Sequence, residues 1–326
     1  MAYATYVNDR IVSALHAQAL DAPYIDKPHL SAPRTRRRAS MRAERRGKRI
    51  VLGFNEAASN AIVDLGECHV MLPELFALLR PLRSLLIAML PDKARAAIKL
   101  SRADQGVDLM LGGFEVHGLH AIETLAAFGK VNSLARLSLD EGLGPSVRYA
   151  PDDVSVTLSG VPIALPEGAF LQATADGEAA LVKAVQSALA GAVEVADLFA
   201  GLGTFALALP GKVHAVEGAR DAVLALIAAR RVAVEHRDLF RRPLSVAELS
   251  RFDGVVLDPP RAGAKEQVAA LAKSTIPKIA YVSCNPATFA RDAQTLVDGG
   301  YRLERITPVG QFRWSTHVEL AAAFIR

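Results

Sequence analysis

The stretch Ala-Val-Glu-Val-Ala-Asp-Leu-Phe-Ala-Gly-Leu-Gly-Thr (192–204) decides the fold. Its apolar, β-branched first half predicts a strand over 193–199, and its glycines predict a tight turn into a helix over 204–209. Strand, glycine turn and helix in this order are typical of the first unit of a doubly wound sheet. In such sheets ligands bind at the carboxyl ends of the strands.

Strands and helices alternate around this stretch. Helices are expected over 176–190, 223–230, 265–273 and 287–298, and strands over 213–216, 254–257 and 279–283. The alternation predicts an α/β fold with a doubly wound, mainly parallel sheet.

The first half of the chain has a different, α+β pattern. We expect an amphipathic helix over 6–20, a β-hairpin over 36–54 that turns near Gly47, an apolar helix over 75–90 interrupted by Pro81, and short strands at 96–101, 107–111 and around Leu137. Strand fragments punctuated by Asp, Gly and Pro follow over 151–166. We place the domain boundary there, which predicts domains 1–165 and 166–326.

Composition favours a soluble globular protein, because 51% of the 326 residues are hydrophobic and a sizeable core can form. The N-terminus lacks the pattern of a signal peptide, and no window has the roughly 18 uncharged apolar residues of a membrane helix. We therefore expect a cytoplasmic protein. The two cysteines, Cys68 and Cys284, cannot build a disulfide framework or a four-cysteine metal site.

Positive charge is concentrated in the predicted hairpin. Between Arg34 and Arg49 there are nine Arg or Lys residues and one acid, Glu44. Such a run is often only a solvated face, but an alternating hairpin of this density is also typical of a surface that follows phosphates. We favour nucleic acid as the partner.

The glycine turn by itself leaves two classes of enzyme open. Gly201, Gly203 and Ala206 match the dinucleotide-binding pattern of nicotinamide or flavin enzymes. Glu217 ends the next strand, where an acid can accept hydrogen bonds from ribose hydroxyls. Asp258-Pro259-Pro260-Arg261 puts a further carboxylate at the carboxyl edge of the sheet, and hydride transfer needs no such group.

Cys284 lies in Tyr-Val-Ser-Cys-Asn-Pro (281–286), between an apolar strand and the start of a helix. A helix N-terminus favours the thiolate, so this position suits a nucleophile. The alternative is a small packing residue at the end of a strand.

In this order the motifs resemble the S-adenosylmethionine-dependent RNA uracil-5-methyltransferases, which form 5-methyluridine in transfer and ribosomal RNA. The motifs are Phe170-Leu171-Gln172, Asp197–Gly203, Val216-Glu217-Gly218, Arg237-Asp238-Leu239, Asp258–Gly263, Ser283–Thr288 and His317-Val318-Glu319. The resemblance covers 165–326. The first half resembles the family's RNA-contacting region more weakly, through Arg36–Arg38, Ile62-Val63-Asp64 and Cys68.

The resemblance implies a Rossmann-like methyltransferase domain preceded by a smaller α+β RNA-contacting domain. It implies that Cys284 adds to carbon 6 of uracil and that Glu319 removes the proton from carbon 5. The S-adenosylmethionine site would comprise Gln172, Phe199, Thr204, Glu217, Asp238 and Asp258. Thr204 stands where relatives often carry Asn, and Asp258 has either the cofactor or the base as its partner. The alternative is an RNA-binding protein that has kept the fold and lost catalysis.

Near the C-terminus we expect a strand over 312–320. Two-residue periodicity would then place Arg313, Ser315, His317 and Glu319 on one face. Phe312 and Trp314 would either stack on a nucleotide or belong to the core.

The chain departs from the family pattern in two features. Many relatives begin with a β-barrel RNA-binding domain and carry a four-cysteine iron–sulfur site. Here the barrel and the three earlier cysteines are absent from the sequence, and Cys68 aligns with the last ligand. We expect no iron–sulfur cluster and no metal.

Overall fold

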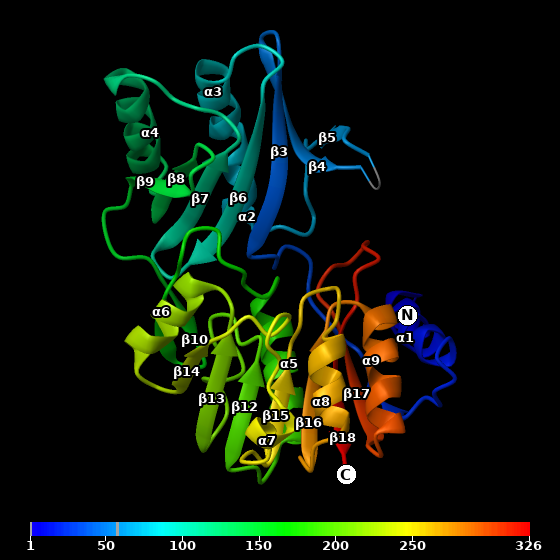
Figure 1. Ribbon diagram of the computed structural model, residues 1–326. Coiled ribbons are helices and arrows are strands. Elements are labelled where there is room, and N and C mark those ends of the chain that lie inside the picture. The colour runs from blue at the N-terminus through cyan, green and yellow to red at the C-terminus, as the bar shows by residue number, and fades with distance from the viewer. Residues whose placement is uncertain (1, 57–58) are drawn as a thin grey trace. The chain divides into compact units, whose positions relative to one another are not determined.

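The computed structural model describes residues 2–56 and 59–326, which form two compact units (Figure 1). The C-terminal sheet unit comprises residues 2–31, Leu158–Ile163 and Gln172–Arg326. The N-terminal sheet unit comprises Ala32–Thr157 and Ala164–Leu171.

This division differs from the expected boundary at 165 in the placement of the first segment. Helix α1 (Ala2–His16) belongs to the C-terminal sheet unit, because Val7, Ile11 and Leu15 are fully buried in the core of that unit. The helix itself was expected from its apolar spacing. The apolar face of this helix packs against residues nearly 300 positions further along the chain. The spacing of apolar residues predicts a helix but does not indicate its packing partner.

Within the described residues, nine strands form the sheet of the C-terminal sheet unit. They are β1 (Tyr24–Ile25), β2 (His29–Leu30), β12 (Glu194–Leu198), β13 (Lys212–Glu217), β14 (Ala233–His236), β15 (Gly254–Leu257), β16 (Lys278–Ser283), β17 (Arg302–Gly310) and β18 (Glu319–Ile325). The order is β1-β17-β18-β16-β15-β12-β13-β14, with β2 also paired to β17. Strand β18 alone among these runs antiparallel to its neighbours β16 and β17. The doubly wound α/β fold is confirmed.

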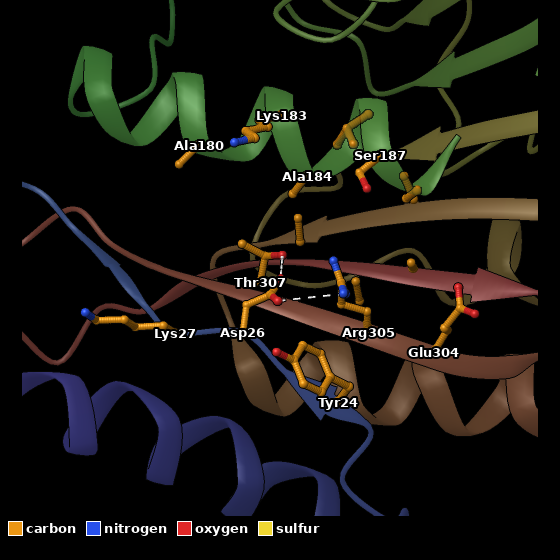
Figure 2. A pocket seen from close by; sticks show the side chains of 16 residues that line it. Tyr24, Asp26, Lys27, Ala180, Lys183, Ala184, Ser187, Glu304, Arg305 and Thr307 are labelled. Carbon is orange, nitrogen blue, oxygen red and sulfur yellow. Dashed lines mark hydrogen bonds and ion pairs between the residues drawn. The ribbon is translucent and has the colours of Figure 1, made fainter. Parts of the chain in front are cut away.

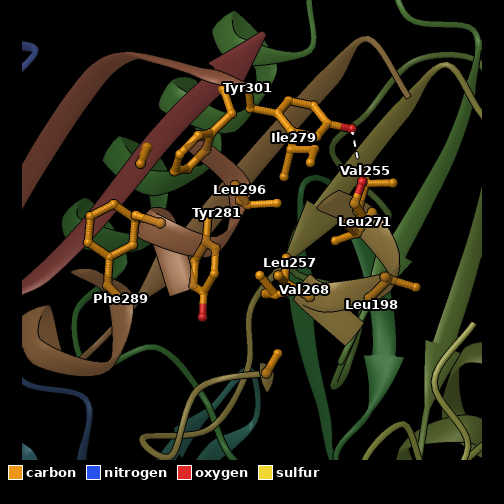
Figure 3. Packing of buried hydrophobic residues seen from close by; sticks show 14 of the residues in the cluster. Leu198, Val255, Leu257, Val268, Leu271, Ile279, Tyr281, Phe289, Leu296 and Tyr301 are labelled. Carbon is orange, nitrogen blue, oxygen red and sulfur yellow. Dashed lines mark hydrogen bonds between the residues drawn. The ribbon is translucent and has the colours of Figure 1, made fainter. Parts of the chain in front are cut away.

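Helices cover both faces of this sheet (Figure 1). One face packs against α5 (Ala175–Ala188) and α6 (Arg220–Ala229). The other packs against α1, α7 (Val246–Leu249), α8 (Lys265–Ala272) and α9 (Pro286–Asp298). Figure 3 shows this second core, in which Leu198 and Leu257 lie near the ends of neighbouring strands. The rings of Tyr281 and Phe289 pack edge to face, with 5.4 Å between their centroids.

Two expected elements of this unit are wrong. The expected helix over 204–209 is instead a series of hydrogen-bonded turns over 201–208, in which Leu207 N donates to Gly203 O but Ala208 N donates to Phe205 O, so regular helical bonding is not sustained. The expected strand over 312–320 is irregular up to Val318, and β18 begins only at Glu319. A turn closed from Ser315 N to Phe312 O, with Trp314 at φ 61°, breaks the strand geometry there.

The N-terminal sheet unit contains a seven-stranded sheet of order β5-β4-β3-β6-β7-β8-β9 in the part that the structure describes. The strands are β3 (Arg38–Arg46), β4 (Arg49–Asn55), β5 (Ile62–Asp64), β6 (Arg95–Ala103), β7 (Gly106–Gly112), β8 (Arg136–Asp140) and β9 (Pro145–Tyr149). The expected hairpin is confirmed as β3–β4 with Gly47 in its turn. A further short hairpin joins β10 (Ser155–Leu158) to β11 (Val161–Ala164).

Helices α2 (Pro73–Ala77), α3 (Leu79–Met89) and α4 (Leu119–Val131) pack on one face of this sheet. Pro81 falls in the first turn of α3, where a missing backbone N–H costs nothing, so it does not interrupt the helix. Met41 of β3, Ile98 of β6 and Leu109 of β7 point into this core, while alternate residues such as Arg42 and Lys99 are exposed. One face of the sheet is therefore polar.

No helix in residues 2–56 or 59–326 combines the length and apolarity needed to cross a lipid bilayer.

Candidate active site

The glycine turn after β12 is held open by Glu217 at the end of β13. Glu217 accepts hydrogen bonds from Gly201 N at 2.8 Å through Oε2 and from Ala219 N at 2.7 Å through Oε1. Each oxygen keeps a second lone pair for a ligand hydroxyl. A Cβ built on Gly201 meets nothing within 4 Å, so open space borders the turn. This geometry fits the ribose role expected for Glu217.

Asp197, near the end of β12 and just before the same turn, is a buried acid. Its Oδ2 accepts from Ala206 N at 2.8 Å, while Oδ1 has no hydrogen-bond partner among the described residues. Burial raises the pKa of the Asp197 carboxyl to about 7. A buried carboxylate with one unsatisfied oxygen beside an open glycine turn suits a ligand that carries positive charge.

Phe199 directly follows β12, Asp238 lies two residues past β14, and both contact an aromatic residue that the sequence analysis missed, across the end of the intervening strand β13. The Phe199 ring lies 5.2 Å from the ring of Phe240, tilted by 53°. Asp238 Oδ1 accepts from Phe240 N at 3.0 Å, which fixes the loop that carries this ring. Phe240 is 46% exposed. A half-exposed aromatic pair at the carboxyl edge is a suitable wall for a flat heterocycle, and an aromatic two residues past Asp238 was the available signal.

Thr204 lies in the turns over 201–208 and is partly exposed. Because the expected helix does not form there, Thr204 belongs to the glycine turn itself and lies on the same segment as Gly201 and Gly203.

Asp258 follows β15, between the glycine turn and the last strands of the sheet. Its backbone N donates to Leu198 O at 3.2 Å, next to the end of β12. Burial, followed by the negative charges of Glu319, Asp197 and Glu217, raises the pKa of Asp258 well above its usual range. The residue still has some solvent-accessible surface, but protein atoms densely surround the carboxyl group. Asp258 is thus electrostatically coupled both to the glycine turn and to Glu319.

Cys284, the first residue after β16, lies opposite Glu319, the first residue of the adjacent antiparallel strand β18. The register of β16 and β18 pairs Ser283 with Leu320, and one step further sets Cys284 against Glu319. Side chains in directly opposed positions have Cβ atoms about 4.5–5.5 Å apart. The two residues proposed from sequence for catalysis are therefore neighbours.

The expected thiolate character of Cys284 is not found. Burial, together with the negative charges of Glu319 and Asp258, raises the pKa of the Cys284 thiol to about 11, against a smaller lowering effect of Arg261. Cys284 does precede a helix, since Asn285 caps α9 by accepting from Ala287 N at 3.1 Å. The carboxylates and the loss of solvent outweigh that helix terminus, and neither was visible in the local sequence.

Gln172 lies apart from the glycine turn. Its Oε1 accepts from Gln311 Nε2 at 3.1 Å, and Gln311 Oε1 in turn accepts from Thr174 N at 3.1 Å. Gln311 directly follows β17, which neighbours β18 and is separated from β12 by β18, β16 and β15. The structure therefore places Gln172 on the Glu319 side of the sheet, and Gln311 is a second residue that the sequence analysis missed.

The loop after Asp258 is tied down by partners on α9 and β16. Arg261 O accepts from Asn285 Nδ2 at 3.1 Å and from Thr288 Oγ1 at 3.0 Å. Asp292, almost completely buried, accepts from Ala264 N at 2.8 Å and from Tyr281 OH at 2.7 Å. The loop that carries Asp258 is held against the loop that carries Cys284.

The irregular segment before β18 reaches the same edge. Arg261 Nη2 lies 2.7 Å from His317 Nδ1, and the His317 ring lies 5.8 Å from that of Phe312. Phe312 is buried, whereas Trp314 is 72% exposed. Of the two aromatics, Phe312 therefore belongs to the core, and Trp314 alone presents a ring to solvent.

Comparisons with known proteins identify relatives of the whole chain. The family model for tRNA (Uracil-5-)-methyltransferase matches residues 228–326. An uncharacterized RNA methyltransferase of Zymomonas mobilis subsp. mobilis is 49% identical over 331 residues, which cover 99% of this chain and 83% of the relative. The 23S rRNA (uracil(1939)-C(5))-methyltransferase RlmD of Aeromonas hydrophila subsp. hydrophila is 32% identical over 309 residues, covering 89% of this chain and 68% of the relative.

Among solved structures, the tRNA (uracil-54, C5)-methyltransferase of Pyrococcus abyssi, in complex with S-adenosyl-L-homocysteine, matches with a TM-score of 0.73. It is 20% identical, and the match covers 98% of this chain and 83% of the other, so it supports the fold. On the sequence relationships, the chain belongs to the family of S-adenosylmethionine-dependent RNA uracil-5-methyltransferases.

Proposed function

We propose that the protein methylates carbon 5 of a uridine in ribosomal or transfer RNA through a covalent adduct between Cys284 and carbon 6. The observation that carries the proposal is the opposition of Cys284 and Glu319 across β16 and β18, beside Asp258. A nucleophile and a base at one sheet edge are the two groups that this reaction needs.

Carbon 5 of uracil is a weak nucleophile, so the ring must first be activated. Addition of the Cys284 sulfur to carbon 6 moves an electron pair onto carbon 5 and the ring carbonyl. With a pKa of about 11, the thiol holds its proton at neutral pH in the free protein, and this proton must leave as the carbon–sulfur bond forms. S-adenosylmethionine supplies an electrophilic methyl group when bound. Glu319 then takes the proton from carbon 5, and the carbon–sulfur bond breaks to return Cys284.

The S-adenosylmethionine site that we propose is centred on the glycine turn. Glu217 would accept from the ribose hydroxyls, since both of its oxygens are already fixed by backbone N–H groups. Phe199 and Phe240 would flank the adenine, with Asp238 holding their loop and Thr204 bordering the turn. Asp258 would face the positively charged end, because it lies between the turn and Glu319.

Gln172 has a different proposed partner from the one first expected. Its position beside Gln311, at the end of β17, supports contact with the target base rather than with the ribose end of the cofactor.

For the RNA itself we propose the polar face of the N-terminal sheet unit. Ser40, Arg42, Asn55 and Lys99 line a hollow of about 250 Å³ on that face. Neither Arg42 nor Lys99 has an ion-pair partner in the residues that the structure describes. Two cations beside neutral donors suit a phosphate backbone.

The decisive experiment supplies the purified protein with S-adenosylmethionine and, separately, ribosomal and transfer RNA that lack 5-methyluridine. Digested RNA is analysed by mass spectrometry. We expect 5-methyluridine from the unaltered protein and from Cys68→Ala, and none from Cys284→Ala. Equal product from Cys284→Ala would rule out the covalent route. Absence of product from both RNAs, with S-adenosylmethionine still bound, would favour an RNA-binding protein without catalysis.

A further inference from the structure

A hollow of about 640 Å³ lies against the sheet of the C-terminal sheet unit (Figure 2). Its floor strands β16, β18 and β17 are separated from β12 and the glycine turn by β15. One wall is α5, through Ala180, Ala184 and Ala188, and the floor is β18, through Ala321–Ala323. Because alanines face each other across the gap, the helix and the strands leave space that larger side chains would fill. We call this hollow the α5 slot.

The outer rim of the α5 slot carries an exposed aromatic ring. Tyr24 is 64% exposed, and the guanidinium carbon of Arg305 lies 5.0 Å from the centre of its ring. Arg305 is also 3.8 Å from Asp26, which accepts from Thr307 Oγ1 at 2.6 Å, as the dashed lines of Figure 2 show. The ring is therefore supported on one side and available to a flat ligand on the other.

Two further cations line the α5 slot. Lys27 comes from the segment after β1 and Lys183 from α5, and neither forms an ion pair with any residue that the structure describes. The two acids of the lining are already engaged, since Asp26 contacts Thr307 and Arg305, and Glu304 lies 3.7 Å from Arg302. The unneutralised charge of the slot is positive.

The α5 slot opens on the same sheet face as the proposed catalytic pair. Side chains alternate along a strand, so Glu319 shares its face of β18 with Ala321 and Ala323, and Cys284 continues the face of β16 that carries Ala280. Glu319 and Ala321 are two residues apart, or roughly 7 Å along the strand. The slot and Glu319 therefore lie on one face of β18.

We propose that the α5 slot binds a single-stranded nucleotide of the RNA substrate next to the target uridine. The base stacks on the free face of the Tyr24 ring, which Arg305 supports from the other side, and Lys27 and Lys183 contact the flanking phosphates. Exposed aromatic rings beside unpaired cations are the usual means of holding single-stranded nucleic acid. An apolar peptide would use the alanine walls but not the two lysines. The proposal rests on the proposed function for its RNA substrate.

The first test measures equilibrium binding of a fluorescein-labelled oligouridylate at several salt concentrations, using fluorescence anisotropy. Tyr24→Ala is expected to weaken binding by about tenfold through lost stacking. Lys27→Gln combined with Lys183→Gln is expected to reduce the slope of log affinity against log salt by about 1.4, for two lost phosphate contacts. Ala184→Phe changes no charge and fills the slot, and it should weaken binding as well.

The matched control is Lys273→Gln, an exposed lysine at the end of α8 on the opposite face of the same sheet. It is expected to leave both affinity and salt slope unchanged. Unchanged affinity in both Tyr24→Ala and Ala184→Phe, with folding verified by circular dichroism, would overturn the proposal. A loss of affinity in Lys273→Gln equal to that in the slot variants would also overturn it.

A second readout separates this proposal from the proposed function. In methyl transfer to a long RNA, the slot variants should raise KM and leave kcat unchanged, because no slot residue touches the reacting atoms. Loss of kcat at unchanged KM would contradict an RNA-binding role for the slot. If the unaltered protein transfers no methyl group, the proposed function fails, while the anisotropy result still decides whether the slot binds RNA.

Discussion

The arginines of the N-terminal sheet unit and the acids of the C-terminal sheet unit differ in how they are used. In the basic run, Arg45 Nη1 donates to Ile87 O at 2.8 Å and to Leu90 O at 2.5 Å, at the end of α3. Arg46 and Arg95 flank Glu44 at 2.7 and 2.9 Å. Much of this charge therefore holds the hairpin to its own unit.

In the C-terminal sheet unit the acids and the cysteine gather where strands end. Glu217, Asp258 and Glu319 all lie at or next to a strand end on one edge of the sheet. Burial, followed by the negative charges of Glu319, Asp197 and Glu217, raises the pKa of Asp258, whereas Glu44 in the basic run is paired with arginines. The comparison teaches that position at a strand end is a better guide to a functional side chain than the local density of charge.

The largest expected effect comes from Glu319→Gln. Loss of the base should slow methyl transfer by about 10²–10⁴-fold. The same change removes a negative charge that raises the pKa of the Cys284 thiol, so alkylation of Cys284 by iodoacetamide at a fixed pH below 11 should become several-fold faster. In both proteins the alkylation rate should rise with pH, because the thiolate increases towards the pKa. Slower alkylation in the variant would contradict the electrostatic coupling of the two residues.

The next effect concerns stability in the N-terminal sheet unit. Arg136 is buried and forms two hydrogen bonds to Asp108, at 2.9 and 2.8 Å. Arg136→Met leaves the Asp108 charge buried without that partner, and should reduce the free energy of unfolding of this unit by about 3–5 kcal/mol. Amide hydrogen exchange in peptides from β7 and β8 would measure this loss of unfolding free energy.

Arg42→Met is the matched control for this change, since Arg42 is exposed on the same sheet. It should alter the free energy of unfolding by no more than about 0.5 kcal/mol. If the two variants exchange equally fast, the distinction between structural and exposed arginines fails.

A smaller loss is expected from Gln311→Leu, which removes the donor to Gln172 and the acceptor for Thr174 N. If Gln172 loses its position, we expect kcat/KM to fall by roughly five- to 150-fold, which corresponds to about 1–3 kcal/mol of lost transition-state stabilisation. Gln311→Glu keeps an acceptor for Thr174 N, removes the donor to Gln172 and adds an acid at a buried position, so its folding is checked by circular dichroism. If Gln311 positions Gln172, both variants lose activity, whereas a purely structural role predicts that Gln311→Glu retains it.

The smallest expected effect is on RNA affinity in the N-terminal sheet unit. Arg42→Gln combined with Lys99→Gln should weaken RNA binding and flatten its salt dependence, by about 0.7 in slope for each phosphate contact to a single strand. Filter binding of ribosomal RNA over a range of salt concentrations measures both. Two results together would contradict the structural role of Arg45. They are unaltered RNA binding in the Arg42→Gln, Lys99→Gln variant and loss of RNA binding in a folded Arg45→Gln variant.

Most of the C-terminal sheet could be predicted because its strands are short apolar runs that end at turn residues. Gly254–Leu257 agrees with the expected strand, and β12, β13 and β16 differ by one residue or two at an end. Helix α4 was missed, although Leu119, Ile122 and Leu125 recur at the three-residue spacing of a helix face. The strand over 312–320 was wrong because alternation of polar and apolar residues also occurs in an irregular segment held by tertiary contacts, here between Arg261 and His317.

Local sequence alone determined the order of strands and helices, the glycine turn and the residues that end each strand, because these depend on backbone preferences and on nearby apolar spacing. Tertiary structure decided which of those ends meet. It set Cys284 opposite Glu319, joined Gln172 to Gln311 across 139 positions, and moved the first helix into the C-terminal sheet unit. It also reversed the expected shift in the Cys284 pKa, because burial and neighbouring charge arise only when segments distant in sequence pack together.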